Sequence, residues 1–399
     1  MNNKSFENTE AMELYSQNFY HSFVLDNGKV WPNFMQLSQT FHHLFFHFNM
    51  ALDEDLSQRI MNIYKPYLSL DPTYFNDFSN FISKVIYKDN DNSFSLQYKL
   101  FYGIIASTTI GLEVLALDFE NKFKLYGGEI SWLQEGIKCE NIPKHIKSFA
   151  KINDILAHNP RILHWTHFGE FDNGLTFFVF QSAIILTTIH RYATIISALN
   201  IFVKKDIMDN KFTDTNEINK FIENNEINKL KDKYILNHIE YEDFNWHGEK
   251  CLYVDEFDWK TNAKYFFSDY AEKEMDFLEK EFKSLDSLSN NINDNENIFN
   301  KKNGIEKYVE IVFGIQDREY DYKNTNKTLT INLKTLIKQI ACFPEKLQEE
   351  NLDVLLQRID KNNLIRLIFL VTAIKQKICL TFFAKAFDEF FGNKKKFNH

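Results

Sequence analysis

Three places in this chain combine side chains that could carry chemistry. The first is the pair His43 and His47, which lie four residues apart, so that a helix would place both imidazoles on one face. A zinc site needs further nitrogen, sulfur or carboxylate ligands, and the flanking residues are mostly Phe and Leu. We therefore interpret the pair as core histidines, with a metal site as the alternative.

Glu113 is the second place, because it interrupts the apolar residues 104–117. A carboxylate buried in such a helix has a raised pKa and can act as a general base. It can equally face water at the helix edge or cap a neighbouring helix. No cysteine lies near it in the sequence, so it has no local thiol to activate.

The third place is the pair His190 and Arg191, which follows the apolar residues 183–186. We interpret this pair as side chains that reach solvent from the end of a helix. The chain has neither a glycine-rich phosphate loop nor a dinucleotide-binding fingerprint. The sequence therefore predicts no bound cofactor and no metal centre.

Helices are the elements expected to position these residues. The chain has 399 residues, with 40 Phe, 12 Gly and 6 Pro. The aromatic content predicts a large buried core, and the scarcity of turn residues favours long helices over many short strands. Helical segments are predicted at residues 35–51, 53–68, 74–85, 96–119, 141–156, 175–200, 305–315, 333–342 and 363–390.

Charge and apolar content limit the partners and the compartment. The net charge of −9 gives no overall attraction to nucleic acid. Residues 1–14 lack the apolar run of a secretion signal, and the longest apolar stretches, 175–189 and 364–374, are shorter than a membrane-spanning helix. The cysteines are far apart, which indicates reduced thiols: Cys139, Cys251, Cys342 and Cys379. We expect a cytoplasmic protein, with the nucleus as a further location, and no membrane insertion.

Changes in composition divide the chain. We predict an N-terminal extension over residues 1–34, a helical domain over 35–203, a charged Asn-rich linker over 204–237 and a second helical domain over 238–399. Another Asn-rich stretch, residues 287–304, is predicted to be a surface loop inside the second domain.

Short motifs follow one another in a definite order in both predicted domains. The first domain contains a glycine pair at 127–128, Trp-Leu at 132–133, Gly136, and the run NDILAHNP at 153–160. The second domain contains YEDF at 241–244, VFGI at 312–315, YDY at 320–322 and ACFPEK at 341–346. This order resembles that of the sestrin family, and the resemblance extends over most of residues 50–390.

The resemblance implies an all-α protein of two related halves, each similar to the alkylhydroperoxidase (AhpD-like) helical bundle. In sestrins the N-terminal half can reduce alkyl hydroperoxides through a Cys-Ser-Tyr run, with a histidine further along the helix. The C-terminal half binds leucine and docks on a GATOR-type complex, which restrains TOR complex 1. Each of these properties depends on the residues that stand at the matching positions.

The redox residues of the family are replaced at the matching positions. Aligned on the glycine pair, the family's cysteine corresponds to Leu112, its tyrosine to Val114 and its relay histidine to Phe119. Peroxide reduction through a sulfenate needs a thiolate and a proton relay, which these side chains do not supply. The resemblance therefore predicts a pseudo-peroxidase without a catalytic residue.

The leucine site of the family is partly replaced. Its arginine corresponds to Lys302, its glutamate to Asn363, a tryptophan to Leu356 and one threonine to Ser289. Lys302 keeps a cation, but Asn363 cannot neutralise an ammonium group, and a buried ammonium without a carboxylate is costly. We take Ser289 and Lys302 as the residual ligand-binding residues and expect weakened or lost leucine sensing, with another small ligand as an alternative.

The partner-binding surface of the family is partly kept. Its acidic pair before the YDY motif corresponds to Arg318 and Glu319, so one acidic position carries the opposite charge. Lys334 and Lys338, four residues apart on one helix face, match lysines of the family. The predicted partner-binding residues are Glu319, Tyr320, Lys334 and Lys338.

Three functions remain open at this point. The favoured one is a non-enzymatic regulator that restrains TOR complex 1 in nutrient and stress signalling by contacting a GATOR-type complex. The second is an alkyl hydroperoxide reductase with a relocated site, for which Glu113 and His190 are the nearest groups. The third is a scaffold with neither leucine sensing nor the usual partner.

Overall fold

The computed structural model describes residues 62–88, 94–171, 175–209, 227–235, 251–288, 302–344 and 349–397, with residues 219, 222 and 347 between them. These residues belong to one compact unit, residues 47–399. The predicted helix at 35–51, with His43 and His47, lies outside the described residues, as do the YEDF motif and Ser289. We call the described residues 62–235 the N-terminal half and 251–397 the C-terminal half.

The N-terminal half is built from helices. Asp71 caps α4 (Pro72–Phe81), because its carboxylate accepts a hydrogen bond from the Tyr74 amide, and Pro72 fits the first turn of that helix. The elements are α4 (Pro72–Phe81), η1 (Ile82–Ile86), α5 (Leu96–Ile110), α6 (Glu113–Leu125), α7 (Ile130–Glu135), η2 (Gly136–Lys138), α8 (Lys144–His158), η3 (Pro160–Ile162), η4 (Trp165–Phe168), α9 (Thr176–Met208) and α11 (Ile227–Tyr234).

The C-terminal half adds more helices and two short strands. Its elements are β1 (Leu252–Tyr253), η7 (Trp259–Ala263), α12 (Lys264–Tyr270), α13 (Glu272–Leu288), α14 (Lys302–Val312), β2 (Ile315–Gln316), α15 (Tyr322–Thr328), α16 (Ile331–Cys342), α17 (Glu349–Leu356) and α18 (Lys361–Phe397). The strands are parallel neighbours, with Leu252 paired to Ile315 and Tyr253 to Gln316. The prediction of an all-α fold is confirmed.

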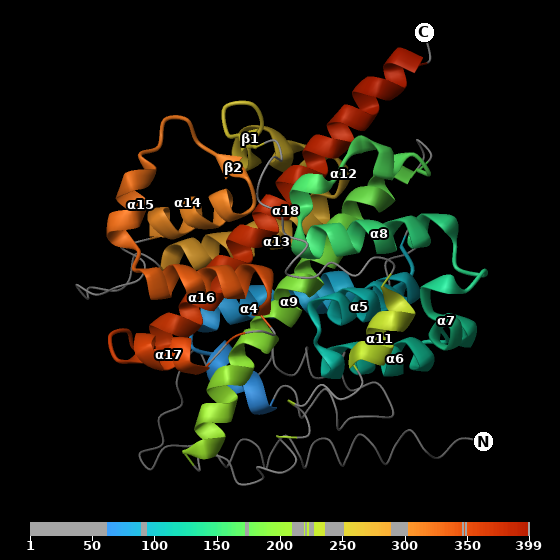
Figure 1. Ribbon diagram of the computed structural model, residues 1–399. Coiled ribbons are helices and arrows are strands. Elements are labelled where there is room, and N and C mark those ends of the chain that lie inside the picture. The colour runs from blue at the N-terminus through green and yellow to red at the C-terminus, as the bar shows by residue number, and fades with distance from the viewer. Residues whose placement is uncertain are drawn as a thin grey trace, which may run out of the picture. The chain divides into compact units, whose positions relative to one another are not determined.

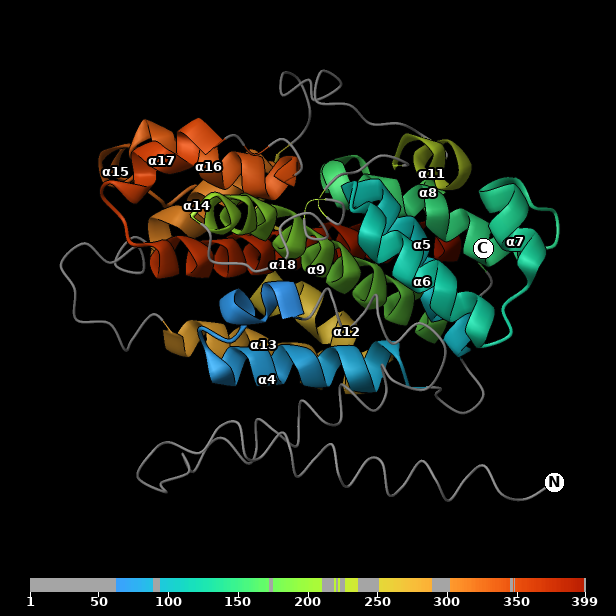
Figure 2. The same ribbon diagram turned by 90° about the horizontal axis from the view of Figure 1, so that it is seen from below.

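Two long helices form the centre of the molecule. Figure 1 and Figure 2 show α9 and α18 crossing, with α5, α6 and α8 toward one end and α14 to α17 toward the other. Helix α13 of the C-terminal half packs against α4 of the N-terminal half. The two halves therefore share one continuous core, which buries most of the aromatic side chains of the described residues.

The predicted helix at 96–119 is two helices. Gly111 ends α5 in the left-handed region, with φ 83°, and α6 begins at Glu113. Glycine adopts this conformation without the strain that a Cβ brings, so it is a common residue after the end of a helix. The predicted helix ran through Gly111, which is instead the break between α5 and α6.

Both central helices are longer than the apolar stretches suggested. Within the described residues, 176–208 and 361–393 are long and apolar enough to cross a membrane by length and composition, with mean hydropathies of 1.3 and 1.7 in their most apolar windows. In this fold 100% and 94% of those windows are buried. The expectation that both segments are too short to span is wrong. Burial of this kind is typical of core helices.

Candidate functional site

The predicted counterpart of the family's redox cysteine lies at the corner between α5 and α6. Leu112 occupies this corner, and Val114 and Phe119 follow on α6; all three side chains are buried. An aliphatic or aromatic side chain can neither form a thiolate nor relay a proton. The corner therefore holds apolar side chains at the three positions that the resemblance assigns to the family's cysteine, tyrosine and histidine.

Phe119 fills the space beside this corner. A Cβ at Gly103 would lie 2.3 Å from the nearest ring carbon of Phe119, so the ring packs directly onto the α5 backbone. On another side the ring stacks on Tyr87, with centroids 6.1 Å apart. Restoring the family's histidine at this position would leave part of the ring's volume empty.

Charged groups are buried next to Phe119. Asp118 and Lys122 form an ion pair one helical turn apart on α6, and Lys122 Nζ lies 4.9 Å from the ring centroid of Tyr87. Burial lowers the pKa of Lys122, and Asp118 opposes that effect. Neither residue is a nucleophile suited to peroxide reduction. We interpret the pair as structural.

Glu113 is the first residue of α6 and is half-buried. It therefore does not lie in the middle of an apolar helix. A carboxylate in the first turn interacts favourably with the helix dipole. This position matches the alternative in which Glu113 is at a helix edge, and it removes the low-dielectric surroundings on which the general-base interpretation depended.

His190 and Arg191 lie in the middle of α9, fully inside the core. The interpretation as a solvent-reaching pair at a helix end is wrong, because α9 continues to Met208 and both side chains are buried. Arg191 Nη2 lies 2.7 Å from Glu281 Oε1 of α13, and the two side chains are 1% and 0% exposed. The ion pair thus joins the N-terminal half to the C-terminal half.

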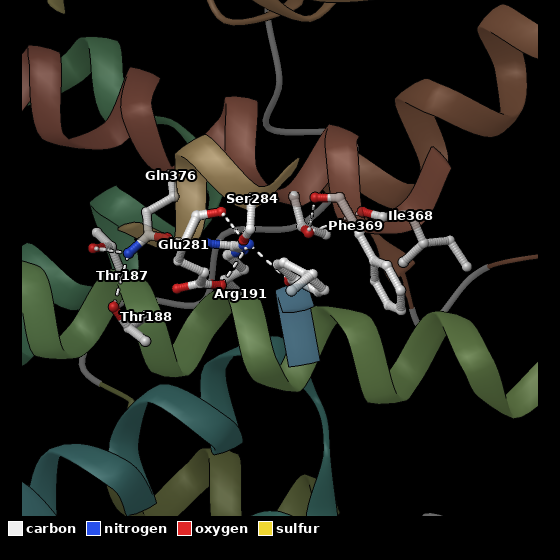
Figure 3. Close-up of polar contacts among 10 residues, drawn as sticks. Thr187, Thr188, Arg191, Glu281, Ser284, Ile368, Phe369 and Gln376 are labelled. Carbon is white, nitrogen blue, oxygen red and sulfur yellow. Dashed lines mark hydrogen bonds and ion pairs between the residues drawn. The ribbon is translucent and has the colours of Figure 1, made fainter. Parts of the chain in front are cut away.

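Further hydrogen bonds extend this ion pair across four helices (Figure 3). Arg191 donates from Nη2 to the Tyr74 hydroxyl of α4 (2.7 Å) and from Nη1 to Gln376 Oε1 of α18 (3.1 Å). Gln376 Nε2 in turn donates to Thr188 Oγ1 (2.8 Å). Burial raises the pKa of Glu281 to about 7, against the opposing effect of Arg191. We call these residues the Arg191 network.

His190 belongs to a second polar group on the other side of α9. Its Nε2 donates to Asn153 Oδ1 of α8 (2.7 Å), and Asn153 Nδ2 donates to Thr109 Oγ1 of α5 (2.8 Å). Burial holds the pKa of His190 well below its usual value, and Lys375 adds to this effect. The imidazole is therefore neutral at physiological pH and fixed by packing, as in a structural histidine.

The ends of α8 and α16 meet near this group. His158 of the NDILAHNP run stacks on Phe343 of the ACFPEK run, with centroids 5.7 Å apart. Cys379 Sγ of α18 donates to the Leu156 carbonyl oxygen (3.1 Å). Burial raises the pKa of Cys379 to about 12. This thiol is protonated at neutral pH, so it is a poor nucleophile.

The predicted ligand residues are occupied by contacts within the protein. Lys302 Nζ lies 2.5 Å from Asp286 Oδ1, and Asn363 Oδ1 accepts from Arg366 Nη1 (3.4 Å). Leu356 is half-buried at the end of α17. No described hydrogen bond or ion pair joins Lys302 to Asn363. Ser289 lies outside the described residues, so its prediction stays open.

The predicted partner-binding residues lie on the C-terminal half. Glu319 is exposed, and the Tyr320 hydroxyl is 3.0 Å from Thr325 Oγ1. Lys334 and Lys338 are half-buried on α16. Residues 317–320 follow β2, while the two lysines belong to a helix that packs against α14, as β2 also does.

Arg318 is held by two acidic residues. Its Nη1 lies 2.5 Å from Asp255 and its Nη2 2.9 Å from Glu256, and its guanidinium is 3.7 Å from the ring centroid of Tyr253. The sequence alone indicated that one acidic position of the family carries the opposite charge at Arg318. The two carboxylates, brought beside it by the pairing of β1 with β2, outweigh its positive charge.

Glu281 is the residue that the sequence could have revealed. It lies on α13 at helical spacing from Leu278 and Leu285, which are both buried. A glutamate on an apolar face indicates a buried partner of opposite charge.

Among the described residues, no group of three or more His, Cys, Asp or Glu side chains could hold a metal ion.

These features define an all-helical protein of two joined halves. A family model described as PA26 p53-induced protein (sestrin) matches residues 35–238 and 220–390. The chain therefore belongs to the sestrin family.

Individual relatives align over short regions. Sestrin-2 of Bos taurus is 29% identical over 112 residues, which are 27% of this chain and 24% of that protein. Sestrin-2 of Homo sapiens is 29% identical over 112 residues, or 27% of this chain and 23% of that protein. Sestrin-2 of Pongo abelii is 47% identical over 45 residues, or 11% and 9%. The aligned region spans about a quarter of the first two relatives.

Proposed function

We propose that this chain is a non-enzymatic regulator that restrains TOR complex 1 in nutrient and stress signalling, by contact with a GATOR-type complex in the cytoplasm. The observation that carries the non-enzymatic part is the α5–α6 corner, where Leu112, Val114 and Phe119 are buried. The C-terminal half exposes charged side chains, and a charged surface suits contact with another protein.

The charge around Arg318 supports the docking part of the proposal. Asp255 and Glu256 together carry two negative charges against the one positive charge of Arg318, and Glu319 adds another exposed carboxylate. The surface is therefore acidic even though one acidic position of the family carries an arginine. Such a surface favours a basic partner and speeds its association.

A charge-reversal experiment tests docking. Glu319→Lys in the full-length protein should reduce capture of GATOR-type subunits from native lysate at least tenfold. Asp269→Lys, which reverses an exposed charge on α12, is the matched control and should capture as wild type does. Equal capture by both variants, or no capture by wild type, would contradict docking through this surface.

We further propose that leucine sensing is weakened or lost. Lys302 is paired with Asp286, and Asn363 carries no charge to neutralise an ammonium group. A thermal-shift panel of the twenty amino acids tests this. A ligand at 100 times its Kd stabilises the folded state by about 2.7 kcal/mol, and we expect no leucine-specific shift. A specific shift would show a working leucine sensor.

We propose, finally, that the chain is a pseudo-peroxidase. The Cys379 thiol is buried with a raised pKa, and His190 is neutral and held by Asn153. Consumption of an alkyl hydroperoxide by the purified protein should equal that of a heat-treated sample. Consumption above this control that Glu113→Gln abolishes would instead support the relocated enzyme site.

A further inference from the structure

Helix α11 packs against other elements of the N-terminal half, although its sequence lies in the predicted linker. It contacts α5 and η2 and buries two side chains, Leu230 and Tyr234, which lie four residues apart on one helix face. Tyr234 is only 1% exposed. The rest of the helix is polar, with Asn228 and Lys229 exposed. This is the pattern of a short amphipathic helix that binds a protein surface.

Tyr234 makes the specific contacts of α11. Its ring meets the edge of Phe101, with centroids 6.2 Å apart, and its hydroxyl donates to Glu120 Oε1 (2.5 Å). Lys233 Nζ lies 3.7 Å from the same carboxylate. Burial and the neighbouring Glu120 raise the pKa of Tyr234, so the phenol keeps the proton that it donates.

Gly136 lets the backbone of α11 approach. A Cβ at Gly136 would lie 2.1 Å from the Lys233 carbonyl oxygen, a distance that real Cβ atoms do not reach. Gly136 also has φ 64°, in the left-handed region. The surface beneath α11 thus has three parts: the Phe101 ring, the Glu120 carboxylate and the bare backbone of Gly136. We call it the α11 groove.

The size of the contact makes it reversible. A helix of eight residues is not stable by itself in water, so α11 is helical only while it is docked. The burial of Leu230 and Tyr234, the hydrogen bond to Glu120 and the ion pair of Lys233 are contacts that must offset the conformational entropy of ordering the helix. The docked and released states are therefore close in free energy, unlike those of the central helices.

We propose that α11 is a tethered helical ligand of the N-terminal half, bound in the α11 groove in exchange with a released state. The occupant is the chain's own segment, recognised by Leu230 and Tyr234 at i and i+4 and by Lys233 beside the acid. The groove discriminates by shape at Gly136 and by the hydrogen bond to Glu120. Release uncovers an aromatic and acidic docking surface.

Hydrogen exchange in two glycine variants tests the docking of α11 in the α11 groove. Gly136→Ala places a methyl group against Lys233. Gly127→Ala has the same left-handed strain (φ 72°), but its Cβ would lie 4.0 Å from Gln97 Nε2, an ordinary van der Waals distance. We expect amides 230–234 to exchange at least tenfold faster in Gly136→Ala than in Gly127→Ala. Equal exchange in the two variants would overturn the proposal.

A peptide of residues 227–235 tests the groove. It should bind a full-length variant with Leu230→Ala and Tyr234→Ala, whose own helix is weakened, at least tenfold more tightly than it binds wild type, where α11 competes. Asn228→Ala, an exposed position on the same helix, is the control and should behave as wild type. Equal affinity for all three proteins, or no binding to the double variant at 1 mM, would overturn the proposal.

Discussion

Asp118 and Lys122 form an ion pair within one helix, whereas Arg191 and Glu281 join helices from the two halves of the chain. Both pairs are buried, and the second has partners on α4 and α18 as well. A pair within α6 forms whenever that helix forms, because its members are one turn apart. A pair between α9 and α13 forms only when the halves pack in one arrangement.

The comparison shows two uses of buried charge. Near the α5–α6 corner, the two charges pair within α6, and Lys122 also contacts Tyr87. In the Arg191 network, charge specifies which helices meet. A buried ion pair is weak evidence for stability, and its better-supported role is to select one arrangement. Removing one member of each pair separates these roles.

Arg191→Met should have the largest effect. It leaves Glu281 buried without its counter-charge, so we expect a loss of about 3–5 kcal/mol in the free energy of unfolding. Urea denaturation of the single and double variants measures it. Arg191→Met with Glu281→Leu should recover most of the loss, because no charge is then buried alone. A loss below about 1 kcal/mol for Arg191→Met would show that the network does not hold the halves together.

The second-largest effect should be a change in the free energy of unfolding with pH, caused by the titration of Glu281. Its pKa in the folded protein, about 7, lies above the ordinary value of 4.5. The folded state therefore binds the proton more tightly, and the stability from this group is full below pH 4.5 and is lost as pH rises through about 7. The loss over this window should be at most about 3 kcal/mol.

Glu281→Gln is the control for this titration. The free energy of unfolding of wild type minus that of the variant should fall between pH 4.5 and 7 and then stay level. The subtraction cancels the contribution of His158 to the pH dependence. The pKa of His158 is lowered to about 3, so this residue destabilises the folded state as the pH falls. A flat difference would mean that Arg191 keeps Glu281 ionised throughout.

Gly103→Ala should have a smaller effect at the α5–α6 corner. The added methyl group would meet the Phe119 ring at 2.3 Å, so the core must shift, at a cost of about 1–3 kcal/mol. Phe119→Leu replaces the ring by a smaller side chain. The double variant should lose less stability than the sum of the losses in the two single variants. Additive losses in thermal denaturation would show that the two residues do not compete for one space.

Arg318→Ala should have the smallest effect on stability. Its ion pairs with Asp255 and Glu256 are about half exposed, so solvent screens them, and we expect a loss smaller than that of Gly103→Ala, which shrinks further at high salt. Chemical denaturation at low and high salt measures it. A loss as large as that of Arg191→Met would mean that exposure does not distinguish the two arginines.

The sequence predicted the helical fold: scarce Gly and Pro favoured long helices, and the resemblance to sestrins implied the all-α class. The assignment of Leu112, Val114 and Phe119 to the family's redox positions depends on the register set by Gly127 and Gly128, and it stays a prediction. The helix break at Gly111 was missed, because a glycine that packs and a glycine that ends a helix look alike in a sequence.

The Arg191 network could not be predicted, because its members are far apart in the chain. Arg191 meets Tyr74 and Gln376 across separations of 117 and 185 residues. A polar pair in an apolar helix therefore looked like a helix end. Helix α11 was missed for another reason: only Leu230 and Tyr234 mark its apolar face, and two residues do not establish a period.

Helix α18 follows, in chain order, all of the helices that it holds together. It packs against α8, α9, α14 and α16, and all of them precede it in the sequence. Synthesis runs from the N-terminus, so these helices leave the ribosome before the helix that covers them exists. A nascent chain therefore carries uncovered apolar surfaces until α18 emerges. Chaperones that bind such surfaces have their substrate in that interval, and folding of the shared core must wait for it to end.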